Sequence, residues 1–262
     1  MIYILRERNS EILKLYGIDK IWEFSEDRDI EGLMQEEKNG RIGVINSTPK
    51  FEKSLARNYP IVIVDSHGDY FHPNFRFSPL PISFFERDAK DVALDLLGKI
   101  IVYDGLAGKI VETEAYYGDK DPASRAYKGK KNYNRGMWLS GGYIFIYMVH
   151  ANWMFNITTD GEEAQAVLIR SVEPIAGLRK MYERRGKRLK ELCNGPGKWT
   201  RAFGIKKEMN EESLGGEIFI AQSPWNEFKV ARAHRIGVRN DLEEPLRFFI
   251  KDSQYVSVRK IS

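Results

Sequence analysis

A proline-rich stretch between residues 73 and 83 most constrains what this chain can fold into. It lies within "HPNFRFSPLPIS" and holds three prolines. Proline fixes φ and has no backbone N–H to donate, so such a stretch cannot continue a helix or lie in the middle of a sheet. We therefore expect a linker over residues 76–83 that separates two units of the 262-residue chain.

Residues 1–75 alternate short apolar runs with polar stretches that are compatible with helices. This alternation favours a small α/β N-terminal domain with some parallel strand pairing, and its role is not indicated by the sequence. The expected strands lie in "IYIL", "RIGVI" and "YPIVIVD", and the expected helices in "NSEILKLYG", "RDIEGLMQEEKNG" and "FEKSLARN".

Residues 84–262 favour an α+β domain with a mainly antiparallel sheet. "KIIVYDGLAGKIVETEAYYG" predicts a hairpin around Asp104-Gly105, and residues 118–141 predict a polar, basic loop. One helix is expected after Ser83, its N-cap, up to Gly98, and another from Pro174. The remaining expected strands lie in "YIFIYMVHANWMFNIT", "AQAVLIRSV", "EIFIA", "LRFFIK" and "YVSV".

Composition sets broad limits on function and location. With 42% hydrophobic and 30% charged residues, the chain is typical of a soluble protein, and no apolar run is long enough for a membrane span. The N-terminus lacks a secretory signal and Cys193 is the single cysteine, which fits the cytoplasm and nucleoid, or the nucleus of a eukaryote. The net charge is −2 over residues 1–80 and +6 over residues 81–262, so an anionic partner would suit the C-terminal part.

Two glutamates stand two positions apart in "IVETEAYYG", residues 110–118. In a strand such residues share one face, so Glu112, Glu114 and Tyr116 are expected on the same side, with the carboxylates about 6.5–7 Å apart. That separation fits a hydrolase acting on a glycosidic bond. On spacing alone, a solvated strand face with Glu112 or Glu114 paired to a nearby Lys or Arg is the more common arrangement.

Several motifs around this stretch resemble, in the same order, the 3-methyladenine (alkyladenine, methylpurine) DNA glycosylase family. The resemblance covers about residues 83–259 and leaves the first 80 residues outside. It implies a curved, mainly antiparallel β-sheet with surrounding helices and a protruding DNA-binding β-hairpin. The motifs are "FFERDAKDVALDLLGKIIV", "GKIVETEAYYGDKDPASRAYKG", "NRGMW", "MFNITT", "AVLIRSVEP", "LCNGPGKWTRAFGI" and "PLRFFIKDSQYVSV".

The activity implied by the resemblance is the removal of damaged purines in base excision repair. The substrates would be 3-methyladenine, 7-methylguanine, hypoxanthine and ethenoadenine in double-stranded DNA. The enzyme would flip the nucleotide out of the duplex and hydrolyse its N-glycosidic bond, leaving an abasic site. No Lys nucleophile, cofactor or metal comes with the resemblance, so a monofunctional glycosylase is expected.

The resemblance also implies roles for individual residues. Glu114 would be the general base that deprotonates the attacking water, and Tyr116 would stack on the flipped base. Glu112 is expected to be structural, binding a backbone or arginine group. Asn156 and Arg170 match the pocket asparagine of the family and the arginine that follows its apolar strand.

One departure from the family concerns Arg125, which stands where the family usually has a histidine facing the flipped base. An arginine should repel a cationic purine, which favours neutral lesions such as hypoxanthine or ethenoadenine. Alternatively, Tyr127 takes the stacking position and Arg125 turns to a phosphate.

A second departure concerns the hairpin whose tyrosine, in the family, enters the minor groove as a wedge. Counting back from Asn156 without a gap puts Val149 at that position. A slip of one residue puts Met148 there, with Tyr147 adjacent, and we favour Met148 as the wedge.

Further contacts with DNA are expected from Arg135, Lys198 and Arg201. Lys198 follows Gly-Pro-Gly just before a predicted helix, where free N–H groups and a lysine can hold a phosphate. Some basic side chains of the helix expected from Pro174 would also touch phosphates. We expect a monomer, with the N-terminal domain available to a repair partner.

The segment "VDSHGDYFH" carries Asp65, His67, Asp69 and His72, which are ligand types of a metal site. A loop with scattered polar residues is the commoner explanation, so no metal is expected. The alternative to an enzyme is a non-catalytic protein that binds damaged DNA and recruits repair partners. The presence of Glu114 disfavours this alternative, whereas the departures from the family at Arg125 and Met148 leave it open.

Overall fold

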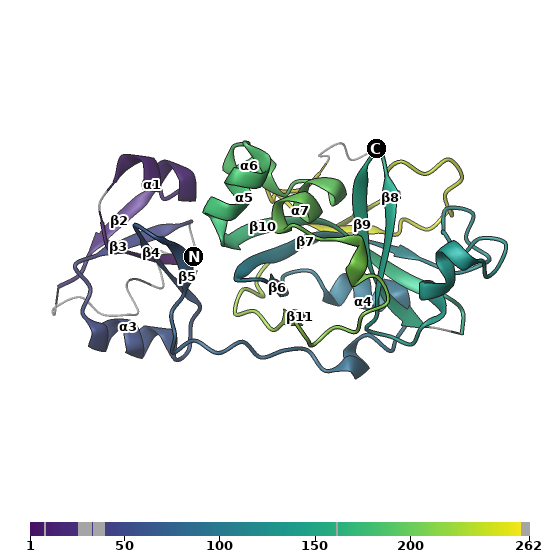
Figure 1. Ribbon diagram of the computed structural model, residues 1–262, viewed down its shortest axis with the longest axis horizontal. Coiled ribbons are helices and arrows are strands. Elements are labelled where there is room, and N and C mark those ends of the chain that lie inside the picture. The colour runs from purple at the N-terminus through teal and green to yellow at the C-terminus, as the bar shows by residue number, and fades with distance from the viewer. Residues whose placement is uncertain (8, 26–32, 34–39, 161, 258–262) are drawn as a thin grey trace.

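An extended segment joins two sheets in the computed structural model, which describes residues 1–7, 9–25, 33, 40–160 and 162–257 (Figure 1). The proline-rich stretch forms this segment. The Leu80 N–H donates to the Ile220 carbonyl at 2.8 Å, and the Gln222 N–H donates to the Ser78 carbonyl at 2.9 Å. The stretch is therefore tied to the second sheet, and the domain limits of 1–75 and 84–262 stay a prediction.

The N-terminal sheet has the order β2-β3-β1-β4-β5. Strands β1 to β4 run parallel to one another and β5 is antiparallel to β4, so the expected parallel pairing is present. Strands β2 and β5 were not expected from the sequence. The strands are β1 (Ile2–Leu5), β2 (Lys20–Glu23), β3 (Ile42–Ile45), β4 (Ile61–Asp65) and β5 (Gly68–Phe71).

Two helices of the N-terminal part begin at polar caps. Helix α1 (Ser10–Tyr16) follows Asn9, whose side chain accepts the Glu11 N–H, and α3 (Pro49–Ala56) follows Thr48, whose hydroxyl accepts the Phe51 N–H. Both helices fall where the polar stretches predicted them. The helix expected in "RDIEGLMQEEKNG" lies almost entirely outside the described residues.

The C-terminal sheet has the order β11-β6-β7-β10-β9-β8, and all its described pairs are antiparallel. The α+β class with a mainly antiparallel curved sheet is confirmed. The hairpin around Asp104-Gly105 is also present. The strands are β6 (Ile100–Tyr103), β7 (Leu106–Tyr116), β8 (Ile144–Val149), β9 (Asn152–Asp160), β10 (Gln165–Ala176), β11 (Ile218–Ala221), β12 (Val230–Ala233) and β13 (Arg247–Ile250).

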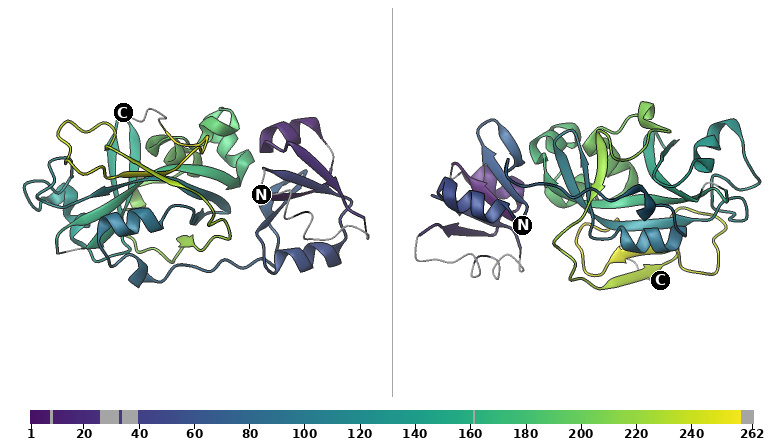
Figure 2. Two further views of the ribbon diagram at one scale, coloured as in Figure 1. Left: turned by 180° about the vertical axis from the view of Figure 1, so that it is seen from behind. Right: turned by 90° about the horizontal axis from the view of Figure 1, so that it is seen from below.

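The helices of this part pack around the sheet, with α4 against β7 and β10 and α7 against β9 and β10 (Figure 2). No described helix is long and apolar enough to cross a bilayer. The helices are α4 (Ala89–Asp95), α5 (Leu178–Arg185), α6 (Leu189–Leu192) and α7 (Pro196–Phe203), and the 3-10 helices are η1 (Ile82–Phe84), η2 (Asn132–Trp138) and η3 (Lys207–Met209).

Four sequence-based expectations about these elements differ from the structure, in whole or in part. Helix α4 starts at Ala89 because Asp88 caps it, whereas Ser83 lies in η1. Pro174 lies near the end of β10, and the expected basic helix is two short helices separated at Gly186, which has a positive φ of 58°. The described part of "YVSV" is irregular rather than a strand, and the loop over residues 118–141 contains η2.

The two sheets share one cluster of buried apolar side chains. It joins Tyr3, Tyr16 and Val64 of the N-terminal part to Ile100 and Ile175 of the C-terminal part. Figure 1 shows the N-terminal sheet beside the end of the C-terminal sheet, close to α5 and α6. The N-terminal sheet therefore covers the end of the larger sheet.

Candidate active site

Strand β7 is central to the candidate site. On one side, it pairs with β10 over residues 107–116. On the other side, residues 106–109 pair with β6 and residues 112–114 pair with β13. On this edge, the partner strand of β7 changes from β6 to β13 beside the two glutamates. The segments that follow β12 and β13 reach this point.

The two faces of β7 differ as the alternation of residues predicts. Val111 is completely buried in the main core, and the Thr113 hydroxyl donates to a carbonyl of α4 at 2.8 Å. The other face carries Glu112, Glu114 and Tyr116. Both glutamates are 0% exposed, so the solvated strand face that spacing alone favoured is wrong.

Arg170 is the extra residue of a β-bulge in β10. Ile169 lies opposite Thr113 and Ser171 lies opposite Glu112, so Arg170 is passed over in the register with β7. Neighbours in a regular strand point to opposite faces, yet Arg170 Nε and Ser171 Oγ donate to the same Glu112 carboxylate at 3.1 and 2.9 Å. The bulge therefore turns both side chains toward the site.

Glu112 is held by donors from three separate segments. Besides the two donors of β10, Arg247 of β13 donates from a guanidinium nitrogen at 3.1 Å. The Ser257 N–H and hydroxyl donate at 2.7 and 2.9 Å. Burial alone would raise the pKa of this carboxyl, but Arg170, Ser257 and Arg247 outweigh burial and hold the pKa of Glu112 below its ordinary value.

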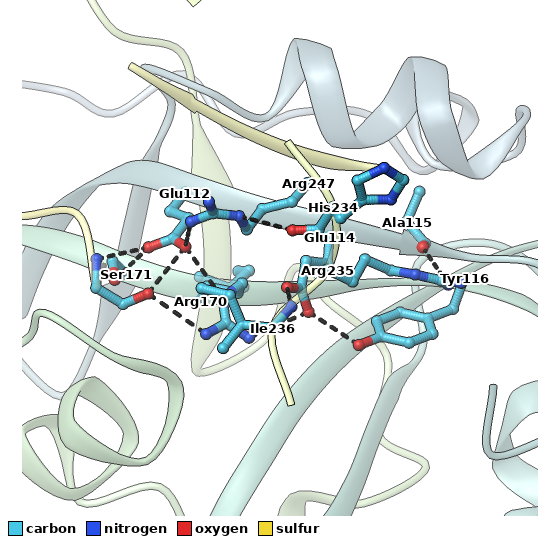
Figure 3. Close-up of polar contacts among 12 residues, drawn as sticks. Glu112, Glu114, Ala115, Tyr116, Arg170, Ser171, His234, Arg235, Ile236 and Arg247 are labelled. Atoms are coloured by element: carbon cyan, nitrogen blue, oxygen red, sulfur yellow. Dashed lines mark hydrogen bonds and ion pairs between the residues drawn. The ribbon is translucent and has the colours of Figure 1, made fainter. Parts of the chain in front are cut away.

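Glu114 has different surroundings (Figure 3). Its Oε2 accepts the Tyr116 hydroxyl at 2.8 Å and an Arg170 guanidinium nitrogen at 3.1 Å, and its Oε1 accepts the Ile236 N–H at 2.8 Å. Burial raises the pKa of Glu114 above its ordinary value, although Arg170 and the Ile236 N–H oppose the rise. Glu114 therefore holds a proton more readily than Glu112 does.

Arg235 is a residue of the site that the sequence analysis missed. Its completely buried guanidinium donates to both carboxylate oxygens of Asp121, at 2.5 and 2.8 Å, and to Asp241 at 2.8 Å. The guanidinium carbon lies 4.6 Å from the centroid of the Tyr116 ring. Arg235 therefore supports Tyr116, and the next residue, Ile236, supports Glu114.

The other expected pocket residues differ in their surroundings. The guanidinium carbon of Arg125 lies 4.4 Å from the centroid of the Tyr147 ring. Tyr127 is exposed, with the Lys128 ammonium 5.3 Å from its ring centroid. The buried Asn156 uses its amide nitrogen on backbone carbonyls of β8 and β9, at 3.1 and 3.3 Å.

The candidate wedge residues lie at the end of the β8–β9 hairpin. Met148 is 52% exposed, whereas Val149 and Tyr147 pack in a small apolar cluster with Tyr116. The turn residues His150 and Ala151 have φ values of 46° and 58°. Positive φ at both central residues is typical of a tight two-residue hairpin turn, which fixes how the hairpin ends.

The cations expected at the DNA backbone differ in their protein contacts. Arg135 makes a two-pronged ion pair with Glu211 at 3.0 and 3.1 Å, and the Lys198 ammonium donates to Asn194 at 3.0 Å. Arg201 is exposed at the surface of α7. These roles in DNA binding stay predictions.

The basic side chains of α5 bind the protein itself. Arg179 donates to the carbonyls of Ser66 and Asp65, at 2.9 and 2.8 Å. Arg184 and Arg185 also donate to backbone carbonyls. These arginines therefore tie α5 to its neighbours.

The acidic and histidine residues of "VDSHGDYFH" are held in separate structural contacts. Asp65 accepts the N–H groups of His67 and Gly68, at 2.8 and 3.0 Å. Asp69 accepts the N–H groups that begin α5, and His72 accepts a backbone N–H. Among the described residues, no group of three or more His, Cys, Asp or Glu could hold a metal ion.

The fold and the site define a class of enzyme. A buried carboxylate with a raised pKa can accept a proton from water, and an aromatic side chain bonded to it can face a planar ligand. A buried carboxylate beside an aromatic ring on an α+β scaffold is typical of enzymes that use acid–base chemistry.

The comparisons with known proteins narrow this class. The family described as methylpurine-DNA glycosylase (MPG) matches residues 83–254. The chain belongs to this family, so it is a DNA glycosylase, a hydrolase of N-glycosyl bonds whose substrate is DNA. The match begins at the end of the proline-rich stretch.

Relatives from different organisms cover the same region. A protein of Agrobacterium fabrum named "Putative 3-methyladenine DNA glycosylase" is 39% identical over 187 residues, which is 70% of this chain and 95% of the relative. Proteins of the same name from Rhizobium etli and Methanoculleus marisnigri are 41% and 39% identical, over 67% and 69% of this chain and 87% and 99% of the relatives.

Proposed function

We propose that this glycosylase removes damaged purines by flipping the nucleotide out of the duplex, with Glu114 as the general base. The observation that carries the proposal is the Glu114 carboxylate, which is completely buried, has a raised pKa and accepts the Tyr116 hydroxyl. A base inside a duplex is out of reach of a side chain, so the nucleotide must leave the stack before it is cut.

The reaction requires one activated water. Glu114 accepts a proton from this water, whose oxygen forms a bond to C1′ of the deoxyribose. The bond between C1′ and the purine nitrogen breaks, and its electron pair leaves with the purine. The negative charge of Glu114 also stabilises the cationic character that develops on the sugar.

The donors around the two carboxylates favour attack by water. Arginine, serine and tyrosine side chains and backbone N–H groups bind Glu112 and Glu114, and none of these described donors is a lysine. A lyase step would need an amine nucleophile that forms a Schiff base. We therefore propose a monofunctional glycosylase that works without a cofactor.

We propose that Arg125 shifts the preference toward neutral lesions such as hypoxanthine and ethenoadenine. Its guanidinium lies on the ring of Tyr147, which shares a cluster with Tyr116. A positive charge at this place disfavours 3-methyladenine and 7-methylguanine, which carry positive charge as lesions in DNA. Hypoxanthine should be excised faster than 7-methylguanine, and Arg125→Gln should reduce the difference. Faster excision of 7-methylguanine by the wild type would contradict this preference.

The remaining parts of the proposal concern the setting of the enzyme. We propose that it acts as a monomer on double-stranded DNA, in the cytoplasm and nucleoid or in a eukaryotic nucleus. The cations Arg135, Lys198 and Arg201 would contact phosphates, and Met148 would fill the place of the flipped nucleotide. The N-terminal part would offer a surface to a repair partner.

The experiment that tests the proposal uses a duplex with one hypoxanthine, followed by alkali to cleave abasic sites. Glu114→Gln should reduce the excision rate by about 10²- to 10⁴-fold. Glu208→Gln, at an exposed position, is the matched control and should leave the rate unchanged. Equal cleavage by wild type and Glu114→Gln would remove Glu114 as the base. Binding without cleavage by both proteins would favour the non-catalytic alternative.

A further inference from the structure

The second half of β10 pairs with β7 on one edge, and its other edge depends on partners outside the sheet. Strand β9 pairs with β10 only over residues 165–168. Beyond that point, the Ile169 carbonyl accepts the indole N–H of Trp199 at 2.8 Å, and the Val172 N–H donates to the Cys193 carbonyl at 3.2 Å. This half of the strand contains the bulge at Arg170, so these partners help to set the position of Arg170.

The N-terminal part supplies the partners at the end of β10. Arg41 donates to the Pro174 carbonyl at 2.6 Å, and the Tyr3 hydroxyl donates to the Ile175 carbonyl at 3.1 Å. Asp69 accepts the two backbone N–H groups that follow the strand, at 2.5 and 3.0 Å. Buried backbone groups are costly to leave unpaired, so these contacts hold the strand end in one place.

Arg41 has the widest set of contacts among these residues. It is buried, and its guanidinium also donates to the Tyr3 hydroxyl at 2.8 Å and to the Tyr16 carbonyl at 3.2 Å. The guanidinium carbon lies 5.8 Å from the centroid of the Tyr255 ring. Ser257, two residues after Tyr255, donates to Glu112 through its N–H and hydroxyl. Arg41 thus contacts both β10 and the segment that carries Ser257.

We propose that Arg41 is a positioning residue for the glycosylase reaction, and that the N-terminal part acts as a clamp on β10. The clamp fixes the strand end on one side of the bulge, and the bulge aims Arg170 at Glu112 and Glu114. A bulge interrupts the ladder, so its geometry depends on how firmly the flanking residues are held. This proposal rests on the proposed role of Glu114 and gives residues outside the family match a part in catalysis.

The test compares Arg41→Met and Arg41→Lys with Arg179→Met in the full-length chain. Arg179 is the matched control because it crosses the same interface but binds carbonyls of residues 65 and 66 rather than β10. Three measurements are made below the unfolding temperature. They are the hydrogen-exchange rate of amides over residues 165–176, the pH profile of single-turnover excision of hypoxanthine, and the steady-state kinetics that give kcat and KM for the same substrate.

If the clamp is correct, Arg41→Met should exchange faster over residues 165–176. Its excision rate should be lower by about tenfold or more, since small misplacements near a reacting centre are costly. KM should stay within about twofold, because removal of a transition-state interaction lowers kcat. The acidic limb of the profile should move to higher pH, because a displaced Arg170 lowers the pKa of Glu114 less. Arg41→Lys should be intermediate, since lysine keeps the charge without the planar fork.

Several results would overturn the clamp. Unchanged exchange over residues 165–176 in Arg41→Met would show that Arg41 does not hold β10. Faster exchange with an unchanged rate and pH profile would show that Arg41 does not position Arg170. If Arg179→Met had the same effects as Arg41→Met, the contacts of Arg41 would contribute only to general stability. A wild type that excises no damaged purine would contradict the proposed function, whereas the exchange rates would still decide whether Arg41 holds the strand.

Discussion

Glu112 and Glu114 lie two residues apart on β7 and are equally buried, but their surroundings differ. Glu112 accepts hydrogen bonds from Arg170, Arg247 and both neighbouring serine hydroxyls, and its pKa is lowered. Glu114 shares Arg170 but otherwise accepts a phenol and one backbone N–H, and its pKa is raised.

Burial alone therefore does not decide how readily a carboxylate takes a proton. Burial penalises the charge of both groups, and the number and charge of the donors decides which group keeps the charge at lower pH. A carboxylate whose oxygens accept several hydrogen bonds from charged donors is a poor proton acceptor, but it holds the donating segments together. One with fewer donors takes a proton more readily, so two carboxylates of a single strand differ in how readily they are protonated.

Removing the arginine shared by the two carboxylates should have the largest effect on stability. Arg170→Met should lower the free energy of unfolding by about 3–5 kcal/mol, because it removes a partner of two buried charges at once. Urea denaturation measures this change. Arg239→Met, at an exposed position, is the control and should change the free energy by no more than about 0.5 kcal/mol. A loss below about 1 kcal/mol for Arg170→Met would show that the carboxylates do not depend on it.

Neutralising each carboxylate separately should distinguish the residue that contributes to stability from the residue that contributes to activity. Glu112→Gln should cost about 2–3 kcal/mol of unfolding free energy, because it weakens hydrogen bonds to a charged group. It should slow excision by less than about tenfold, since Glu114, the proposed base with a contribution of ~10²–10⁴, is retained. Glu114→Gln should do the reverse, with stability at pH 7 kept within about 1 kcal/mol because relief of a buried charge offsets a lost acceptor. Equal changes in unfolding free energy and in excision rate for the two variants would contradict this difference between the carboxylates.

The two carboxylates should also affect the pH dependence of stability in opposite directions. The lowered pKa of Glu112 stabilises the fold above the pKa of the unfolded chain, about 4.3, and this contribution is lost as the pH falls through the folded value. The raised pKa of Glu114 means that the fold gains stability as the pH falls through that value toward the unfolded one. Unfolding free energies of wild type, Glu112→Gln and Glu114→Gln across pH should show both trends. Parallel curves for all three would contradict the opposite shifts.

The smallest effect is expected at the hairpin end, away from both carboxylates. Met148→Ala should leave the unfolding free energy within about 0.5 kcal/mol, because the side chain is largely exposed. It should weaken binding to damaged DNA by about tenfold, or 1.4 kcal/mol, if Met148 fills the vacated stack. Val149→Ala is the comparison, since Val149 packs near Tyr116 and should cost stability instead. A larger loss of DNA affinity for Val149→Ala would move the wedge to Val149.

Local patterns predicted much of the fold. The hairpin at Asp104-Gly105 follows from two residues that accept positive φ, and their φ values are 50° and 73°. The strand face of Glu112, Glu114 and Tyr116 follows from a period of two. Pro174 misled the helix prediction, because tertiary pairing of β10 with β7 extends past it and a strand end tolerates a missing N–H.

The site could be predicted only in part, because its remaining members meet through long-range contacts. The bulge that aims Arg170 depends on the register of two strands, which no local pattern fixes. Arg235 lies 114 residues from Asp121, its partner, and no spacing rule joins them. Arg247 and Ser257 fall in the motif "PLRFFIKDSQYVSV", which was a usable signal for the partners of Glu112.

The most direct test of the asymmetry is a 13C NMR titration of the glutamate side-chain carboxyls, with signals assigned by their loss in Glu112→Gln and Glu114→Gln. We expect the Glu114 signal to titrate above the ordinary pKa of glutamate and the Glu112 signal to titrate below it. A Glu114 pKa at or below that of Glu112 would contradict the assignment of Glu114 as the base and Glu112 as the scaffold.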